Sequence, residues 1–315
     1  MKILFMGTPD LAKTCLEAVY NKEGVEIIGV VTQTDKPKGR GMKLIPPPVK
    51  VFAEEHGIPV FQPQTLKNGA FEEELNTLAP EMIIVAAYGK ILPPYVLNYP
   101  KYGCICAHGS ILPKYRGASP IQRAIIDGET ETGITAMYMD DGIDTGDIIK
   151  IYPCEILPDD NFGTVHDKLA IIAGEAMCDV IDMTENGTVT RTKQDDSKSN
   201  YAAKIEKEDT IVDFTKNARD VVNLIRGLSP IPYAVTKTPD GKLLKLSDAH
   251  LSSFDGSGEA GEVVSLDSKG AGEIVISCGD GNIAVSGVVP EGKKPMSAAD
   301  FIRGRKISVG DILKY

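Results

Sequence analysis

The chain of 315 residues is predicted to be an α/β protein in which a doubly wound, Rossmann-like sheet is followed by a small C-terminal β-barrel of OB-like type. Two patterns predict this fold. In residues 1–189, short apolar runs alternate with helical patterns, as in a parallel sheet that helices cover on both faces. In residues 209–315 the apolar runs are shorter and glycines separate them, which is typical of a small barrel.

The first domain opens with a strand at residues 2–6, and a helix begins at Thr8-Pro9 because proline fits the first helical turn. A second apolar run at residues 25–31 completes a β-α-β unit, so these two strands should be parallel. Further strands are expected at residues 59–61, 82–86 and 103–107, with a hairpin formed by residues 132–138 and 147–153. The first expected helix passes through residues 11–19 and ends near residues 21–24, and further helices should cover residues 49–56, 70–78, 120–127 and 163–186.

Residues 190–208 are polar and almost free of large apolar side chains, and they are predicted to link domains at residues 1–189 and 209–315. The second domain should contain one helix at residues 217–228. Short strands are expected after it at residues 234–236, 243–246, 262–266, 273–277 and 283–289.

The composition limits the kind of partner that the protein can bind. With 34 Lys and Arg against 44 Asp and Glu, the net charge is −10, which disfavours a protein whose whole surface binds nucleic acid. Residues 209–315 hold 14 acidic and 13 basic residues, so nearly all of the acidic excess lies in residues 1–208. A local basic patch is still compatible with this charge.

The compartment and assembly are also constrained. The six cysteines form no C-x-x-C pair and no secretory signal opens the chain, so a reduced, cytoplasmic protein is expected. The longest apolar stretch, residues 82–87, is far shorter than the roughly 18 residues of a membrane span, so no membrane insertion is expected. No dimerisation helix is evident, and a monomer is expected.

Reactive residue types are densest around Cys106 and His108. If residues 103–107 form a strand, the two side chains share one face at its carboxyl end, where open α/β sheets bind ligands. A histidine there can also be purely structural, held by hydrogen bonds. Of the four histidines, however, His108 is the one placed for chemistry.

A second cluster, residues 139–147, carries four aspartates on a glycine-rich hairpin. A calcium loop is disfavoured because the ligand spacing and the closing Glu of an EF-hand are absent, and no metal is expected. The cluster can be a solvated acidic turn. Alternatively, one of its carboxylates can orient a catalytic histidine.

A third cluster lies in a Lys/Pro/Gly-rich loop at residues 34–48 of the acidic first domain. Its basic side chains include Lys36, Lys38, Arg40 and Lys43. Such a loop suits contacts with phosphate groups, although a charged surface loop without a partner has the same composition. No G-x-G-x-x-G or Walker-type loop occurs, so no motif supports a dinucleotide or ATP site.

Taken together, these segments resemble the methionyl-tRNA formyltransferase family, and the resemblance extends over essentially the whole chain. The matching stretches are residues 5–10, 32–41, 87–93, 108–122 and 139–147. The histidine, the S-x-L-P element and the D-T-G-D element belong to all 10-formyltetrahydrofolate transformylases. The basic loop and the trailing barrel favour the enzymes that act on tRNA.

The resemblance implies transfer of the formyl group of 10-formyltetrahydrofolate to the α-amine of methionine on the initiator tRNA, for translation initiation. Residues 1–189 would be the catalytic domain. His108 would assist proton transfer and contact the oxyanion, while Asp144 would orient His108 or relay protons. The barrel at residues 209–315 would help to hold the tRNA.

The same resemblance assigns binding residues for both substrates. Those for the folate co-substrate are Ser110, Ile111, Leu112, Pro113, Tyr88, Gly89, Ile91, Leu92, Asp140, Asp141 and Gly142. Those for the tRNA are Lys36, Lys38, Arg40 and Lys43.

Two departures from the family stand out. Cys106 occupies a catalytic position where the family usually has Asn, and Pro230-Ile231-Pro232 replaces P-W-P without catalytic meaning. A thiol is a weaker donor to an oxyanion than an amide, and losing one such donor typically costs about 10²–10³ in rate. Three interpretations are open: a weakly active or engineered variant, a donor supplied by a backbone N–H or a water, or a Cys106–His108 thiolate pair that accepts the formyl group covalently.

Other functions are also open at this point. The acceptor can be water or an amino sugar rather than tRNA, and the protein can bind tRNA or folate without activity. The basic loop and the barrel favour tRNA over these alternatives.

Overall fold

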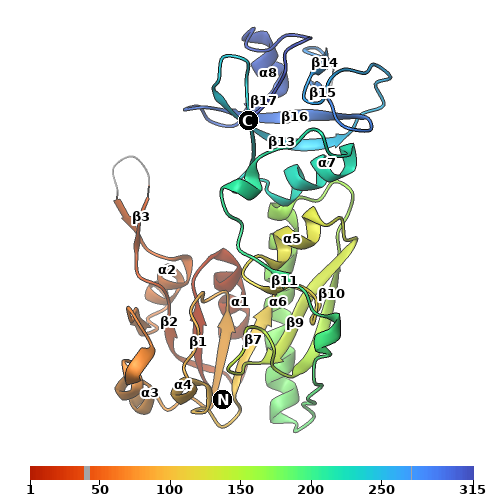
Figure 1. The fold of residues 1–315 in the computed structure, drawn as a ribbon. Helices are drawn as coiled ribbons and strands as arrows, with labels where there is room; N and C mark the ends of the chain where they lie inside the picture. The colour runs from red at the N-terminus through yellow and green to blue at the C-terminus, as the bar shows by residue number, and fades with distance from the viewer. Residues whose placement is uncertain (39–42, 271) are drawn as a thin grey trace. The chain divides into compact units, whose positions relative to one another are not determined.

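The computed structural model describes residues 1–38, 43–270 and 272–315 (Figure 1). The chain divides into two compact units. Unit 1 consists of Met1–Pro120, Glu131–Glu155 and His166–Ala202, and unit 2 consists of Ile121–Thr130, Ile156–Val165 and Ala203–Tyr315.

Unit 1 is built on a seven-stranded sheet with the strand order β10-β9-β7-β6-β1-β2-β5. Its strands are β1 (Lys2–Gly7), β2 (Glu26–Val31), β5 (Val60–Phe61), β6 (Met82–Ala86), β7 (Cys104–His108), β9 (Glu131–Tyr138) and β10 (Ile148–Glu155). The five strands from β5 to β7 are parallel, whereas β9 runs antiparallel to both β7 and β10. Every residue of β6 and β7 is buried, which explains why the sequence of β6 is a continuous apolar run.

The helices of unit 1 follow the strands in the predicted order. They are α1 (Asp10–Tyr20), α2 (Pro48–Glu55), α3 (Glu72–Leu78), α4 (Pro94–Leu97) and most of α6 (Phe162–Glu185). α1 begins directly after Pro9, which is its N-cap residue rather than part of the first turn, and buries Leu11, Cys15 and Val19. The sequence pattern does not predict α4, because a single turn is too short to show a helical period.

Short ladders and 3-10 turns complete unit 1. β3 (Lys36–Lys38) and β4 (Lys43–Ile45) form an antiparallel hairpin inside the region predicted as a loop. β8 (Arg116–Gly117) pairs in parallel with β11 (Tyr201–Ala202), which lies in the predicted linker. The 3-10 turns are Lys67–Gly69 and Asp196–Lys198. Residues 190–202 therefore belong to unit 1, and the domain boundaries at residues 189 and 209 stay a prediction.

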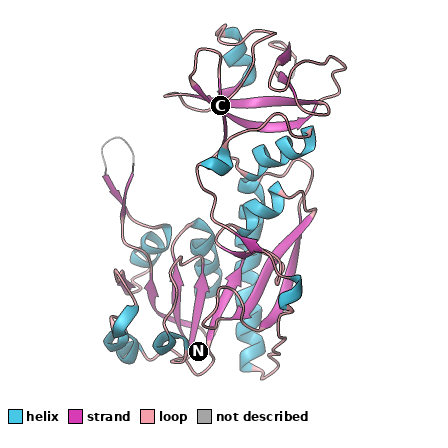
Figure 2. Ribbon diagram, in the orientation of Figure 1, coloured by secondary structure: helices cyan, strands magenta, loops and turns pink. Residues whose placement is uncertain are grey.

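Unit 2 contains an antiparallel sheet with the strand order β12-β13-β16-β15-β14, and β17 pairs with β16. The strands are β12 (Ala234–Lys237), β13 (Leu243–Leu251), β14 (Val263–Leu266), β15 (Ile274–Ser277), β16 (Asn282–Pro290) and β17 (Met296–Ser297). In Figure 2 these strands (magenta) are joined mainly by loops (pink). Five of the six strands are predicted, whereas the two residues of β17 give no pattern.

The main helix of unit 2 is α7 (Ala218–Gly227), and its cap agrees with the predicted start. Asn217 accepts a hydrogen bond from the backbone N–H of Asp220, and the buried face of α7 packs into the core beneath the sheet. The other helical elements are α8 (Ala298–Arg303), residues 121–126 of α5 (Pro120–Ile126) and the 3-10 turn Glu208–Thr210. The predicted fold class is confirmed: a Rossmann-like, mostly parallel sheet and a C-terminal antiparallel sheet.

Candidate active site

His108 is the last residue of β7, at the carboxyl end of the parallel part of the sheet. Its side chain is only 6% exposed. The Nε2 atom lies 2.9 Å from the carbonyl oxygen of Tyr115. Because a carbonyl oxygen only accepts hydrogen bonds, Nε2 carries a proton and donates it, which leaves Nδ1 as the nitrogen available for proton exchange.

Asp144 faces this available nitrogen. It lies in the loop between β9 and β10, and its Oδ2 atom is 3.6 Å from Nδ1 of His108. The same Oδ2 accepts a hydrogen bond of 2.8 Å from the backbone N–H of Gly117, which fixes the carboxylate. The 3.6 Å between Nδ1 and Oδ2 is too long for a direct hydrogen bond, but the carboxylate would stabilise an imidazolium ion at His108. The structure thus brings the predicted histidine and aspartate together.

The acidic loop is organised by its own polar groups. Asp140 Oδ1 accepts hydrogen bonds from Gly142 N at 3.0 Å and from Thr145 Oγ1 at 2.7 Å. Asp140, Asp141 and Gly142 are exposed. Asp144 has a left-handed backbone with φ of +54°, a conformation that aspartate adopts more readily than most residues. The loop is therefore held in a defined conformation by its own hydrogen bonds.

Ser110 and Thr135 hold the S-x-L-P loop against β9. Ser110 is fully buried, and its Oγ donates to the carbonyl oxygen of Lys114 at 2.7 Å. Thr135 Oγ1 donates to the carbonyl oxygen of Ser110 at 2.6 Å and accepts from the backbone N–H of Leu112 at 3.1 Å. Ser110 thus shapes the loop. The sequence does not single out Thr135, because a threonine within a buried strand belongs to no motif.

Cys106 lies in β7, two residues before His108, and is 9% exposed. It belongs to a hydrophobic cluster that also contains Leu92, Leu112 and Met137. Burial raises the pKa of the Cys106 thiol far above its usual value, and the nearby charge of Asp144 adds to this. The side chain is therefore a protonated thiol at neutral pH, which disfavours the thiolate pair with His108.

The predicted folate residues divide into a buried and an exposed group. Tyr88, Leu92 and Leu112 are buried and belong to the same hydrophobic cluster as Cys106. The Tyr88 hydroxyl has no hydrogen-bond partner among the described residues, and burial raises the pKa of Tyr88 to about 12. Ile91 is 79% exposed, and Gly89 is exposed as well, whereas Ile111 and Pro113 are half-buried.

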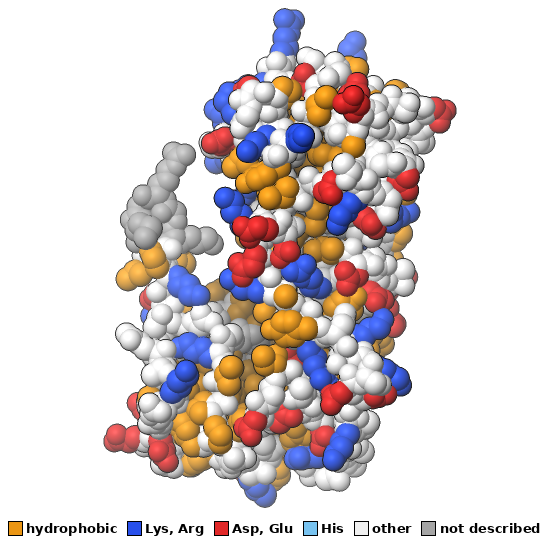
Figure 3. All heavy atoms as spheres, in the orientation of Figure 1, with side chains coloured by type: hydrophobic (Ala, Val, Ile, Leu, Met, Phe, Trp, Pro, Cys, Tyr) orange, Lys and Arg blue, Asp and Glu red, His pale blue; other side chains and the backbone are white. Residues whose placement is uncertain are grey.

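Three of the predicted tRNA residues, Lys36, Lys38 and Lys43, lie on β3 and β4. Lys36 is exposed, and its Nζ donates to Oε1 of Gln33 at 2.7 Å. Lys38 and Lys43 face each other in the backbone register, but their side chains, like the whole of Arg40, lie outside the described residues. On the face drawn in Figure 3, basic side chains (blue) are interspersed with acidic ones (red).

In the described part of the chain, no group of three or more His, Cys, Asp or Glu side chains could hold a metal ion. Over the same residues, no helix has the length and apolar character needed to cross a membrane.

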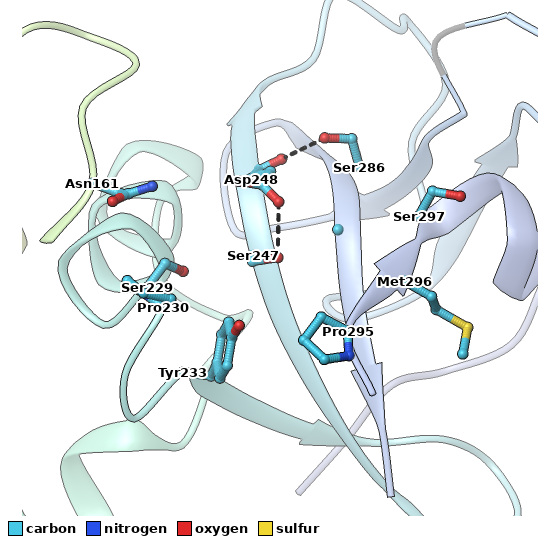
Figure 4. A pocket seen from close by; sticks show the side chains of 11 residues that line it. Asn161, Ser229, Pro230, Tyr233, Ser247, Asp248, Ser286, Pro295, Met296 and Ser297 are labelled. Carbon is cyan, nitrogen blue, oxygen red and sulfur yellow. Dashed lines mark hydrogen bonds between the residues drawn. The ribbon is translucent and has the colours of Figure 1, made fainter. Parts of the chain in front are cut away.

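Unit 2 has a separate cavity of about 450 Å³, which Pro230 helps to line (Figure 4). Two of its hydroxyl groups already bond within the protein: Ser247 Oγ donates to Asp248 Oδ2 at 2.9 Å and Ser286 Oγ donates to the Asp248 carbonyl at 3.1 Å. None of the predicted site residues lines this cavity.

Comparison with known proteins identifies the family. The model described as "Formyl transferase" matches residues 1–181, and the model described as "Formyl transferase, C-terminal domain" matches residues 204–306. The methionyl-tRNA formyltransferase of Ruminiclostridium cellulolyticum is 46% identical over 315 residues, which cover 99% of each chain. The chain belongs to the methionyl-tRNA formyltransferase family.

Two solved structures have a similar fold. An N-formyltransferase from Helicobacter canadensis, in complex with folinic acid and dTDP-3-aminofucose, has a TM-score of 0.66 at 22% identity and covers 90% of this chain and 98% of its own. A variant of HypX from Aquifex aeolicus has a TM-score of 0.64 at 18% identity over 96% of this chain, which spans 48% of HypX. At such identities the likeness concerns the fold alone.

Proposed function

We propose that the protein transfers the formyl group of 10-formyltetrahydrofolate to the α-amine of methionyl initiator tRNA. The observation that carries this proposal is the His108–Asp144 pair at the carboxyl end of β7. It occurs in a chain that is 46% identical over its length to a methionyl-tRNA formyltransferase. The α-amine must be neutral to attack the formyl carbon, so a group that handles its protons is needed beside it.

The pair suits both proton transfers of the reaction. A bond forms between the amine nitrogen and the formyl carbon, and the bond from that carbon to the folate nitrogen breaks. The amine loses one proton and the folate nitrogen gains one. His108 Nδ1 can accept the first proton and return it to the leaving nitrogen, and Asp144, 3.6 Å away, stabilises the imidazolium between these steps.

The formyl oxygen gains negative charge during the attack and needs hydrogen-bond donors. We assign this contact to His108 in its protonated form. Cys106 can contribute only a weak S–H donor, because burial keeps it as a thiol. We therefore treat Cys106 as a weak hydrogen-bond donor rather than as a nucleophile.

The folate co-substrate would be held at the buried cluster near His108. The unpartnered Tyr88 hydroxyl among apolar side chains suits a flat heteroaromatic ring with a polar edge. Leu92 and Leu112 would cover the ring, and the exposed backbone at residues 140–142 would contact its polar groups. In this proposal Ser110 acts indirectly, through the shape of the loop.

The basic hairpin would contact the acceptor end of the tRNA. Lys36, Lys38, Arg40 and Lys43 supply the positive charge that phosphate groups need in an otherwise acidic domain. We infer further that the enzyme is a cytoplasmic monomer with a catalytic domain at residues 1–189 and no metal requirement. A chelator that abolishes turnover, or a dimer in sedimentation, would contradict the last two inferences.

A direct assay tests the proposed function. The purified protein is incubated with 10-formyltetrahydrofolate and charged initiator tRNA, and formylmethionyl-tRNA is measured beside reactions that offer only water or an amino sugar nucleotide. His108→Ala should lower kcat by about 10²–10⁴, because general acid-base catalysis contributes that much. His250→Ala, which removes a histidine that is 57% exposed in unit 2, is the matched control. Folate hydrolysis or sugar product without tRNA product would overturn the proposal.

A further inference from the structure

A segment outside both family models contributes to the scaffold of the active site. The match to the first family model ends at residue 181, and the match to the second begins at residue 204. Residues 182–202 belong to unit 1. Within residues 191–200, Gln194 and Ser199 are the two residues that are not exposed. Nothing in the polar sequence of this segment predicts a role in catalysis.

Gln194 uses both ends of its side-chain amide. Its Nε2 donates to the carbonyl oxygens of Asp144 at 2.9 Å and of Gly146 at 2.8 Å. Its Oε1 accepts two hydrogen bonds from the buried guanidinium group of Arg116, at 3.0 Å and 2.8 Å. One side chain thereby ties residues 144–146 to residues 115–117.

These two stretches hold the two members of the proposed catalytic pair. On one stretch, the carbonyl oxygen of Tyr115 accepts the hydrogen bond from His108, and the N–H of Gly117 donates to Asp144. On the other stretch, Asp144 itself supplies the carboxylate. A shift of either stretch therefore changes the distance between Nδ1 of His108 and Oδ2 of Asp144.

The bonds from Gln194 also fix the backbone at and just after a residue with a left-handed conformation. Asp144 has a φ of +54°, and such a left-handed conformation persists only where its surroundings determine it. Gln194 binds the carbonyl of Asp144 and that of Gly146, on both sides of Thr145. Asn200 adds support, because its Oδ1 accepts from Tyr115 N and its carbonyl accepts from Arg116 N at 3.1 Å.

We propose that Gln194 is a positioning residue for formyl transfer, which sets the geometry of His108 and Asp144 from the segment between the two family domains. This inference rests on the proposed function. Gln194 contacts neither imidazole nor carboxylate, so it acts through the backbone of the Asp144 loop and through Arg116.

Steady-state kinetics of Gln194→Ala and Gln194→Glu test the inference. Both variants should lower kcat by about 10- to 100-fold, because small misplacements of catalytic groups cost that much, while both KM values stay within about two-fold. The glutamate keeps an acceptor for Arg116 but loses both donors to the carbonyls. Asp195→Asn is the control, because among the described residues that carboxylate bonds to its neighbours Ser197 and Lys198, and it should keep the wild-type kcat.

A double-mutant cycle separates positioning from general destabilisation. If Gln194 positions Asp144 against His108, Gln194→Ala should cost clearly less kcat in an Asp144→Asn background than in the wild type. Thermal unfolding is measured for every variant, and Gln194→Glu serves if the alanine variant does not fold. The inference is overturned by an unchanged kcat, by losses that multiply in the cycle, or by a rise in KM alone. If the wild type forms no formylmethionyl-tRNA, the proposed function fails instead.

Discussion

Cys106 shows how one side chain changes the chemistry expected of this site. It lies in an apolar cluster at 9% exposure, and burial raises the pKa of its thiol, so the thiolate that a covalent mechanism needs is scarcely populated. Two of the three interpretations from the sequence stay open. The enzyme is weakly active, or another donor contacts the oxyanion.

Replacing this thiol by the usual amide distinguishes these two cases. Cys106→Asn should raise kcat, by up to about 10²-fold, because the amide supplies N–H donors where the thiol supplies a weak one. It should also lower the melting temperature, because an amide among apolar side chains costs free energy unless it is hydrogen-bonded.

Cys104→Asn is the matched control for Cys106→Asn. Cys104 is buried in the same strand and the same cluster, four residues from His108, so its replacement should destabilise the fold without raising kcat. An unchanged or lower kcat in Cys106→Asn would mean that another group already supplies the missing donor.

At the residue scale, the sequence predicts the groups that carry chemistry better than the groups that hold them. His108 and Asp144 belong to compact motifs. The period of two residues along β7 places His108 on the same face as Cys106, at the carboxyl end of the strand. Thr135 and Gln194 act through bonds to backbone carbonyls, and Gln194 lies 50 residues from Asp144. Such contacts depend on the folded path of the chain and leave no periodic pattern.

At the scale of elements, the pairing of β8 with β11 joins residues 116–117, which follow the S-x-L-P loop, to residues 201–202. Gly117 permits this pairing. It has a φ of +117°, and a Cβ on this residue would lie 2.7 Å from the ring of Tyr201 and 2.8 Å from the carbonyl oxygen of Ala202. A side chain at this position would therefore push β11 away.

Gly117→Ala should lower both stability and activity. We expect a loss of about 1–3 kcal/mol in the free energy of unfolding, from the strained backbone and the overlap with β11. The kcat should fall as well, because the N–H of Gly117 fixes the Asp144 carboxylate. Chemical denaturation and single-turnover kinetics measure the two effects.

Gly187→Ala controls for the backbone conformation alone. Gly187 also has a positive φ, of +67°, but nothing lies within 4 Å of a Cβ built there. It should lose less stability than Gly117→Ala and keep its kcat. Equal losses in the two variants would show that the contact with β11 is unimportant.

The β3–β4 hairpin is the element that we expect to bind the tRNA. Combined Arg40→Ala and Lys43→Ala substitutions should raise the KM for tRNA by about 10- to 100-fold and leave the KM for folate nearly unchanged, because charged hydrogen bonds to phosphate are lost. Lys13→Ala with Lys22→Ala changes the net charge equally on and beside α1, and serves as the control. Equal increases in both KM values would contradict the role of the hairpin.

Periodicity predicts the long elements of the fold and misses the short ones. The alternation of apolar runs and helices predicts β1, β6 and α6 close to their observed limits, because each is long and buried on a regular pattern. The β3–β4 hairpin and β11 have two or three residues per strand. Strands this short show no period of two residues, so composition alone indicates a loop or a linker there.

At the scale of the whole molecule, the net charge of −10 and a tRNA substrate are compatible only if the binding contacts are local. The acidic excess lies in residues 1–208, where the hairpin is a basic exception, and residues 209–315 are almost neutral. Most of the surface therefore repels or ignores a polyanion, and this repulsion restricts the tRNA to a few positions.

The dependence of the reaction on salt measures how many such contacts form. Each phosphate contact releases condensed counterions, so four contacts give a slope of about −3 to −4 in a plot of log affinity against log salt concentration. Raising KCl from about 50 to 200 mM should then raise the KM for tRNA roughly 50- to 150-fold. The Arg40→Ala and Lys43→Ala double variant should flatten the slope by about two contacts, whereas the α1 control keeps it. A slope near zero would mean that the tRNA is recognised without phosphate contacts. A slope of about −8 or steeper would mean that a broad basic surface binds it.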